Sequence, residues 1–140
     1  MCGIAGILTG NPRDPSELSR ITGIMAERMT HRGPDDAGGW VHPAGRLAFG
    51  FRRLAIQDLS EAGHQPMHSD TGRFSLVFNG EIYNFEALRR ILPKGPYRGG
   101  SDTEVLLRAF ETWGVRATLP RLVGMFAFAV WAEREGSPWL

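Results

Sequence analysis

The amino terminus is the feature of this sequence that most limits what the chain can be. Its first seven residues are Met-Cys-Gly-Ile-Ala-Gly-Ile, and their glycines and branched apolar side chains predict a short buried strand that fixes the terminus. Cys2 is the only cysteine of the chain and directly follows Met1. We expect Met1 to be removed, because a small second side chain permits it. Cys2 would then carry a thiol and a free α-amine on one residue.

A thiol beside its own base is an activated nucleophile. An α-amine, with an ordinary pKa of about 8, is largely available as that base near neutral pH. A lone cysteine is also commonly a small buried apolar residue. The position of Cys2 alone leaves both interpretations open.

Composition excludes several functional classes. The chain has 140 residues, 42% of them hydrophobic, which is enough for one domain with a core. A formal net charge of +1 favours neither nucleic acid nor an anionic membrane. No apolar run approaches the roughly 20 residues of a membrane span, and we find no secretory signal. A single cysteine excludes an internal disulfide. We therefore expect a cytoplasmic protein with no nucleic-acid and no membrane partner.

Periodicity and turn signals predict a mixed chain of the α+β class. We expect helices after a cap at Asp14, over 83–92, and from a capping box at Ser101 to a stop at Gly114. We expect strands over 39–42, 46–51 (continuing to 56), 73–78 and 124–131. The first helix carries an apolar stripe that we assign to the core, namely Leu18, Ile21, Ile24, Met25 and Met29. The 124–131 strand is apolar at nearly every position, so both of its faces should be covered. Because the next apolar run begins only at Trp139, we expect an incomplete domain.

Several polar motifs have ordinary structural explanations. The segment 31–38 is predicted to be a turn, and its adjacent Asp35 and Asp36 are more typical of turn chemistry than of an acid–base pair. His64 and His68 have the spacing of a helical metal pair, but the proline between them argues against a helix, and we expect no metal site. We expect 57–72 to form a long loop of the kind that covers a site.

Two further motifs also have structural explanations. Asn79-Gly80 is a common turn dipeptide. Asp102 in the first turn of a helix is favoured by the helix dipole.

The only lysine, Lys94, precedes Gly95-Pro96, which excludes a phosphate-loop lysine motif.

Five separated stretches together resemble the class II glutamine amidotransferases, which are amino-terminal-nucleophile (Ntn) hydrolases. They are Met1-Cys2-Gly3-Ile4-Ala5-Gly6, His31-Arg32-Gly33-Pro34-Asp35, Arg53-Leu54-Ala55-Ile56, Phe78-Asn79-Gly80-Glu81-Ile82-Tyr83-Asn84 and Ser101-Asp102-Thr103-Glu104. Within that family the chain is most similar to the glutaminase domain of glutamine-hydrolysing asparagine synthetases. Three features favour this group over the phosphoribosylamine- and glucosamine-forming members. They are Pro34, the sequence Asn-Gly-Glu-Ile-Tyr-Asn and the Gly63–Met67 stretch. The chain departs from the family at Ala132, where an acidic residue is usual.

The resemblance implies an αββα sandwich with antiparallel sheets, truncated at its carboxyl-terminal end. Residues 1–140 would be an incomplete glutaminase domain, without the synthetase domain that follows it in the family. The catalytic residues that the resemblance implies are Cys2 as nucleophile, with the Asn79 side chain and the Gly80 backbone N–H as oxyanion hole. The implied glutamine-binding residues are Arg53 for the α-carboxylate, Asp102 with Glu81 for the α-ammonium, and Leu54, Ile56, Asn79 and Gly80 lining the slot.

The resemblance also implies a role in asparagine biosynthesis. Glutamine would be hydrolysed to glutamate and ammonia, and the ammonia would be used in ATP-dependent asparagine synthesis, a ligase reaction. The expected partners are glutamine and a synthetase domain of the same polypeptide or complex, and a homodimer is possible. No cofactor is expected in this chain, while ATP and magnesium would belong to the synthetase domain. The alternatives are an amidotransferase domain for a sugar or secondary-metabolite acceptor, an inactive interaction or regulatory module, and a peptidase with the same nucleophile.

Overall fold

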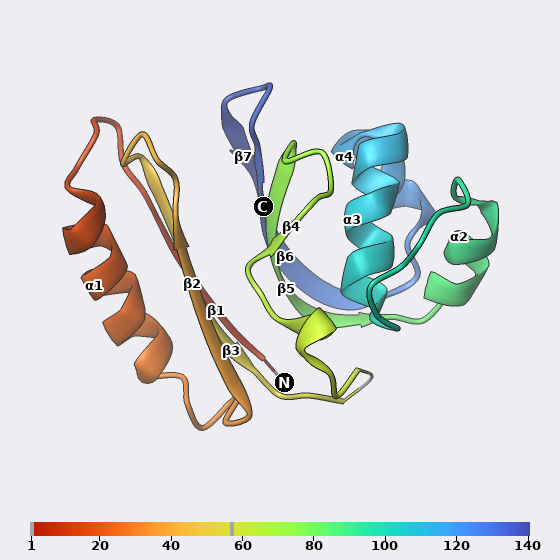
Figure 1. Cartoon of the computed structure of the whole chain (residues 1–140), viewed down its shortest axis with the longest axis horizontal. Coiled ribbons are helices and arrows are strands. Elements are labelled where there is room, and N and C mark those ends of the chain that lie inside the picture. The colour runs from red at the N-terminus through yellow and green to blue at the C-terminus, as the bar shows by residue number, and fades with distance from the viewer. Residues whose placement is uncertain (1, 57) are drawn as a thin grey trace. The chain divides into compact units, whose positions relative to one another are not determined.

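The computed structural model describes residues 2–56 and 58–140, which form two compact units (Figure 1). Unit 1 contains the described residues up to Ala55 together with His64–Pro66, and unit 2 contains the described residues of Ile56–Gly63 and Met67–Leu140. Each unit combines helical structure with an antiparallel sheet, which agrees with the predicted α+β class. In the part of the chain that the structure describes, no helix is long and apolar enough to cross a membrane.

Unit 1 is a three-stranded antiparallel sheet with one helix on it (Figure 1, red to yellow). Its elements are β1 (Gly3–Leu8), α1 (Pro15–Glu27), β2 (Asp36–Val41) and β3 (Leu47–Arg53). The strand order is β1-β3-β2, so β3 pairs with both neighbours. Gly3 lies opposite Arg52 in the β1–β3 register, and Gly39 lies opposite Gly50 in the β2–β3 register. The predicted hairpin is confirmed, but β2 already begins at Asp36, inside the segment that we expected to be a turn. The expected continuation to 56 is wrong, because β3 ends at Arg53. Strand β1 forms as predicted but is only partly buried, since it is an edge strand.

Helix α1 begins as predicted but buries a different face. Asp14 is its N-cap, and the Asp14 carboxylate accepts the N–H of Ser16 at 3.0 Å. The buried residues are Leu18, Thr22 and Ala26, which are spaced four apart. The predicted apolar stripe is wrong at Ile24 and Met25, which are 44% and 38% exposed.

The cause is a close approach of α1 to the sheet. A Cβ added to Gly50 would lie only 2.7 Å from the carbonyl oxygen of Thr22 and 3.3 Å from Cβ of Ala26. The helix backbone at Thr22 and the small side chain of Ala26 occupy the space beside Gly50. The larger Ile24 and Met25 lie away from this contact and are exposed.

Unit 2 is a four-stranded antiparallel sheet of order β4-β5-β6-β7 that packs against helices (Figure 1, green to blue). Its elements are η1 (Glu61–Gly63), β4 (Met67–His68), β5 (Phe74–Ile82), α2 (Phe85–Ile91), α3 (Asp102–Trp113), α4 (Val115–Thr118), η2 (Leu119–Arg121), β6 (Gly124–Ala132) and β7 (Ser137–Trp139). Its core joins β5, β6 and α3. The Phe110 ring of α3 lies 6.0 Å from Phe74 and 5.5 Å from Phe128, measured between centroids. The predicted inward face of β5, with Phe74, Leu76 and Phe78, is confirmed by their burial.

The ends of α3 are those predicted. The Ser101 hydroxyl accepts the N–H of Glu104 at 3.3 Å, and Gly114, with φ +80°, ends the helix. Helix α2 is shorter than predicted. Its Leu88 is buried, whereas Ile91 is 63% exposed.

Four expectations for unit 2 are corrected. The described part of 57–72 is not all loop, since it contains η1 and β4. Strand β5 continues through Asn79-Gly80 to Ile82, because each of these residues pairs with β6, so this dipeptide is not a turn. Strand β6 is covered on both faces only in its second half: Met125 is 72% exposed. Ala132, where the family usually has an acid, is the buried last residue of β6, and the strand after it begins at Ser137 rather than Trp139.

Candidate active site

The Cys2 thiol in unit 1 contacts the peptide groups of Leu54. The N–H of Leu54 points at the sulfur at 3.4 Å, and the thiol is 3.7 Å from the Leu54 carbonyl oxygen. Cys2 is a half-buried free cysteine. Removal of Met1 concerns a residue outside the described ones and stays a prediction.

Arg53 lies opposite Cys2 when the β1–β3 register is extended by one position. Gly3 lies opposite Arg52 in an antiparallel pair, so the residue before Gly3 lies beside the residue after Arg52. Arg53 is buried, with 8% of its surface exposed. Arg52 points to the opposite face, as alternation along a strand requires. Its guanidinium donates to the carbonyl of Gly33 at 2.9 Å, and it lines a groove beside α1.

The turn between α1 and β2 supports both Cys2 and the segment after Arg53. Arg32 donates from Nε to the carbonyl oxygen of Cys2 at 3.1 Å. Asp35 accepts the N–H of Ala55 at 2.8 Å and donates its own N–H to the carbonyl of Arg53 at 3.0 Å. Gly33 packs so closely that an added Cβ would lie 2.5 Å from a backbone atom of Arg52. We predicted no role for these residues, and the only signal was that their stretch is one of the five that carry the resemblance.

Asn79 and Gly80 lie within β5 of unit 2. The side-chain oxygen of Asn79 is buried and has no hydrogen-bond partner among the described residues. Gly80 has φ +153°, and an added Cβ would collide with the carbonyl oxygen of Met125 on β6. The neighbouring strand therefore requires a glycine here, and the role of the Gly80 N–H in an oxyanion hole stays a prediction. An unpartnered buried amide is the more informative of the two features, because such groups are rare without a functional reason.

Asp102 joins the first turn of α3 to the end of β5. It is 5% exposed, and its carboxylate accepts the N–H of Ile82, the residue after Glu81, at 2.9 Å. Burial raises the pKa of Asp102 above its usual range, and the hydrogen bonds from Ile82 and Thr103 oppose that shift. None of the groups acting on this pKa is a cation. Among the described residues, hydrogen-bond donors are thus the groups that favour the ionised form of this buried acid.

The remaining predicted positions are less constrained. Ile56, in the first segment of unit 2, exposes 62% of its surface. The two histidines of the 64–68 stretch are engaged separately: His64 with Asp36 at 2.7 Å and His68 with Ser75 at 2.8 Å. Within the described residues there is no group of three histidine, cysteine or acidic side chains that could hold a metal ion.

Comparison with known proteins gives a consistent result. Residues 1–140 match a family model described as a glutamine amidotransferase domain. The chain is 35% identical over 141 residues to asparagine synthetase (glutamine-hydrolyzing) 2 of Bacillus subtilis, covering 100% of this chain and 18% of the relative. It is 42% identical over 146 residues to a putative asparagine synthetase (glutamine-hydrolyzing) of Mycobacterium tuberculosis, covering 94% and 22%. It is 33% identical over 144 residues to Amidase chry2 of Gibberella zeae, covering 96% and 21%. The chain thus spans about a fifth of the length of these relatives.

Proposed function

The chain belongs to the glutamine amidotransferase domain family, and from this premise we propose that it hydrolyses glutamine to glutamate and ammonia with Cys2 as an amino-terminal nucleophile. The observation that carries the proposal is the position of the Cys2 thiol, against the Leu54 peptide and beside Arg53. An N–H directed at the sulfur stabilises negative charge on it, which the attacking thiolate requires.

In the proposed mechanism the α-amine of Cys2 takes the thiol proton and the sulfur attacks the side-chain carboxamide of glutamine. The carbonyl oxygen gains negative charge, and the Asn79 amide and the Gly80 N–H donate to it. The amine returns the proton to the departing nitrogen, so ammonia leaves and a thioester remains. Water then hydrolyses the thioester to glutamate and restores the thiol. The buried amide oxygen of Asn79, without a hydrogen-bond partner among the described residues, supports a polar ligand at this point of β5, because such groups are rare without a functional reason. The donor to the oxyanion would be the NH2 group of the same amide.

The same proposal assigns the two charged ends of glutamine. Arg53 offers a planar pair of donors to the α-carboxylate. Asp102, together with Glu81, would bind the α-ammonium, while the backbone of Leu54 and Ile56 lines the slot. A buried carboxylate without a cation is costly, and a substrate ammonium would compensate it. This supports free glutamine as the substrate, because a peptide-bound glutamine lacks both charges.

We further assign the fold to the Ntn αββα sandwich. Each unit has an antiparallel sheet with a helical layer on one face, and two such pairs are the components of that architecture. The amino-terminal strand β1 starts one residue after the proposed nucleophile, as this mechanism requires.

For the fate of the ammonia we propose ATP-dependent asparagine synthesis in a synthetase domain of the same polypeptide or complex. The support is that relatives matching 94–100% of the chain are named asparagine synthetases, one of them putative. ATP and magnesium would act in that domain, and the cytoplasm is the compartment that we propose for the enzyme. Another acceptor is the second candidate, because a relative of comparable identity is named an amidase.

The experiment is a glutaminase assay on the purified protein. We expect equal amounts of glutamate and ammonia from free glutamine, and none from a glutaminyl peptide. Release from the peptide at a comparable rate would indicate a peptidase, and no release from either substrate would indicate an inactive module. Asparagine formation from aspartate, ATP and glutamine in the whole enzyme would separate the two acceptors.

A further inference from the structure

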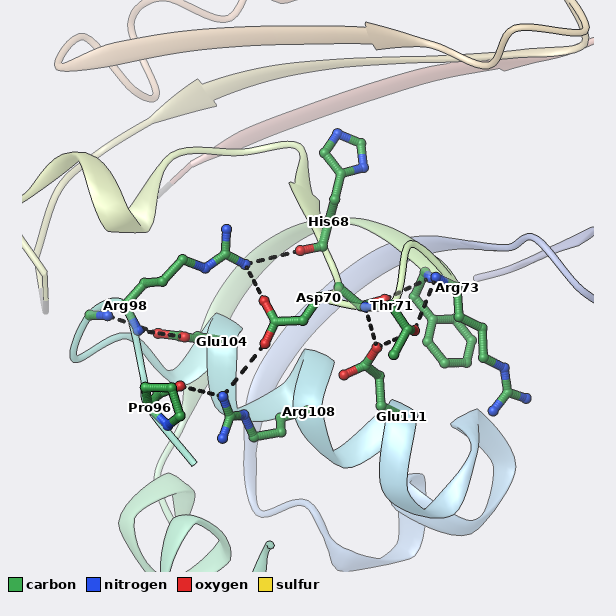
Figure 2. Close-up of polar contacts among 12 residues, drawn as sticks. His68, Asp70, Thr71, Arg73, Pro96, Arg98, Glu104, Arg108 and Glu111 are labelled. Atoms are coloured by element: carbon green, nitrogen blue, oxygen red, sulfur yellow. Dashed lines mark hydrogen bonds and ion pairs between the residues drawn. The ribbon is translucent and has the colours of Figure 1, made fainter. Parts of the chain in front are cut away.

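The segment 98–100, which leads into Asp102, is held by the carboxylates of two other segments. The N–H groups of Arg98 and Gly99 donate to the two oxygens of Glu104, at 2.8 and 2.9 Å. The next N–H, that of Gly100, donates to Asp58 at 2.8 Å. Three successive backbone donors are therefore satisfied by carboxylate oxygens. Figure 2 shows Glu104 of α3 directly against the backbone of Arg98.

The other side of this segment is held by arginines of α2 and α3. Arg89 donates to the carbonyl of Gly99 at 3.3 Å. Arg108 donates to the carbonyl of Pro96 (Figure 2). The guanidinium carbons of these two arginines lie 3.9 and 4.1 Å from the ring centre of Tyr97. Both helices thus contribute to the path of the chain before Asp102.

Asp58 differs from the other residues that hold this segment, because it comes from neither helix. It lies two residues after Ile56, in the part of unit 2 that precedes η1. Its other oxygen accepts the N–H and the hydroxyl of Ser60, at 2.9 and 2.6 Å. Gly99 has no room for a side chain here, because an added Cβ would collide with the Asp58 carboxylate. Asp58 therefore connects two chain segments that are 42 residues apart.

We propose that Asp58 is a positioning residue that couples the segment of Ile56 to the segment of Asp102 and thereby sets the affinity for glutamine. This inference rests on the proposed function, in which both segments contribute to the glutamine slot. Only a carboxylate suits the position, since both of its oxygens face donors. An asparagine would turn its NH2 group toward Gly100 N–H or toward Ser60. Asp58→Asn is thus nearly isosteric and breaks the coupling on one side.

The test uses the purified protein and the glutamine dependence of ammonia release. We expect Asp58→Asn to raise the KM for glutamine about tenfold, the size of one lost charge-assisted hydrogen bond. We expect kcat to stay within about twofold, because Asp58 touches no reacting atom. The control is Asp70→Asn, which removes the same charge from unit 2. Among the described residues Asp70 forms ion pairs with the side chains of Arg98 and Arg108, at 3.5 and 3.7 Å (Figure 2), and it is 64% exposed. The KM of Asp70→Asn should therefore not change.

A second measurement does not depend on activity. Hydrogen exchange at the Gly100 amide, without glutamine, should be faster in Asp58→Asn than in the unchanged protein and in Asp70→Asn. Unchanged exchange would overturn the coupling itself. Faster exchange with an unchanged KM, or a loss confined to kcat, would overturn its role in affinity. If the unchanged protein releases no ammonia from glutamine, the proposed function fails and the affinity role falls with it, while the exchange result still decides the coupling.

Discussion

Units 1 and 2 hold their candidate residues in different ways. Unit 1 presents Cys2 directly before an edge strand, and the thiol hydrogen-bonds with the backbone of Leu54. Unit 2 presents Asp102 inside a capped helix that packs on an aromatic core. The nucleophile can therefore be changed with little effect on packing. In unit 2, substitution of Asp102 is expected to alter the stability of the fold as well as the binding of glutamine.

The largest effect is expected at Cys2. Cys2→Ala should lower glutamine hydrolysis on the order of a thousandfold or more, because no other cysteine exists in the sequence. The midpoint of thermal unfolding should stay the same, since only the sulfur is lost. Ammonia release and a melting curve measured by circular dichroism provide the two readouts.

An amino-terminal tag gives the control for this prediction. Extra residues before Cys2 block its α-amine but leave the thiol, and activity should disappear as it does in Cys2→Ala. Proteolytic removal of the tag to expose Cys2 should restore it. Full activity with the tag in place would contradict the role of the amine.

Asp102 should show the opposite combination to Cys2. Asp102→Asn should weaken glutamine binding at least about thirtyfold, as expected when one partner of a buried charge pair is removed. Its stability at neutral pH should be equal or higher, because the variant keeps an acceptor for Ile82 and loses a buried charge. Titration calorimetry in a Cys2→Ala background and thermal melts measure the two effects. A large loss of stability together with the loss of binding would indicate a purely structural residue.

The raised pKa of Asp102 also fixes the direction of its pH dependence. Binding of an ammonium requires the ionised carboxylate, and burial raises this pKa above the usual aspartate range. Glutamine affinity should therefore begin to fall, as the pH decreases, at a higher pH than for an exposed aspartate. For stability, a raised pKa in the folded state means that this group favours folding at low pH and that the contribution is lost as the pH rises through that pKa. Both dependences should be absent in Asp102→Asn.

Substitutions at the adjacent Arg52 and Arg53 of unit 1 should affect glutamine binding less than Asp102→Asn does. Arg53→Lys should raise the KM for glutamine about tenfold, because lysine keeps the charge but loses the two-pronged fit to a carboxylate. Arg52→Lys should be close to neutral for KM, because Arg52 points to the α1 face and bonds to Gly33. Ammonia release over a range of glutamine concentrations separates the two. If Arg52→Lys is the impaired variant, the assignment of this stretch is shifted by one residue.

Local signals predicted the ends of elements better than their contacts. The caps at Asp14 and Ser101 and the stop at Gly114 were predicted correctly, because a cap depends on a few neighbouring residues. The continuation of β5 through Gly80 was missed, since pairing with Phe126 of β6 overrides the turn preference of Asn-Gly. The exposure of Ile24 was missed because it depends on the close contact between α1 and Gly50 of strand β3.

The candidate site shows the same limit. The sequence indicated Cys2, Arg53 and Asp102 through residue type and resemblance, and their roles stay proposals. It gave no role to the residues that hold them. Arg32 reaches Cys2 across 30 positions, and Asp58 reaches Gly100 across 42. Such contacts leave no periodic pattern, so only the folded chain reveals them.

The smallest effect is a change in stability, expected at two glycines of the unit 1 sheet. Unit 2 differs in that its core is aromatic. Gly50 and Gly39 are ladder partners on β3 and β2, but their surroundings differ. A Cβ at Gly50 would lie 2.7 Å from the Thr22 carbonyl oxygen, whereas at Gly39 the nearest atom is 3.7 Å away. Gly50→Ala should destabilise the protein by about 1–3 kcal/mol through overpacking against α1. Gly39→Ala should stay within about 0.5 kcal/mol of the unchanged protein, with a small gain from reduced chain entropy. Denaturant unfolding of the two variants measures the difference. Equal stabilities would mean that α1 can move away from the sheet at little cost, and the close contact would then no longer explain why Ile24 and Met25 are exposed.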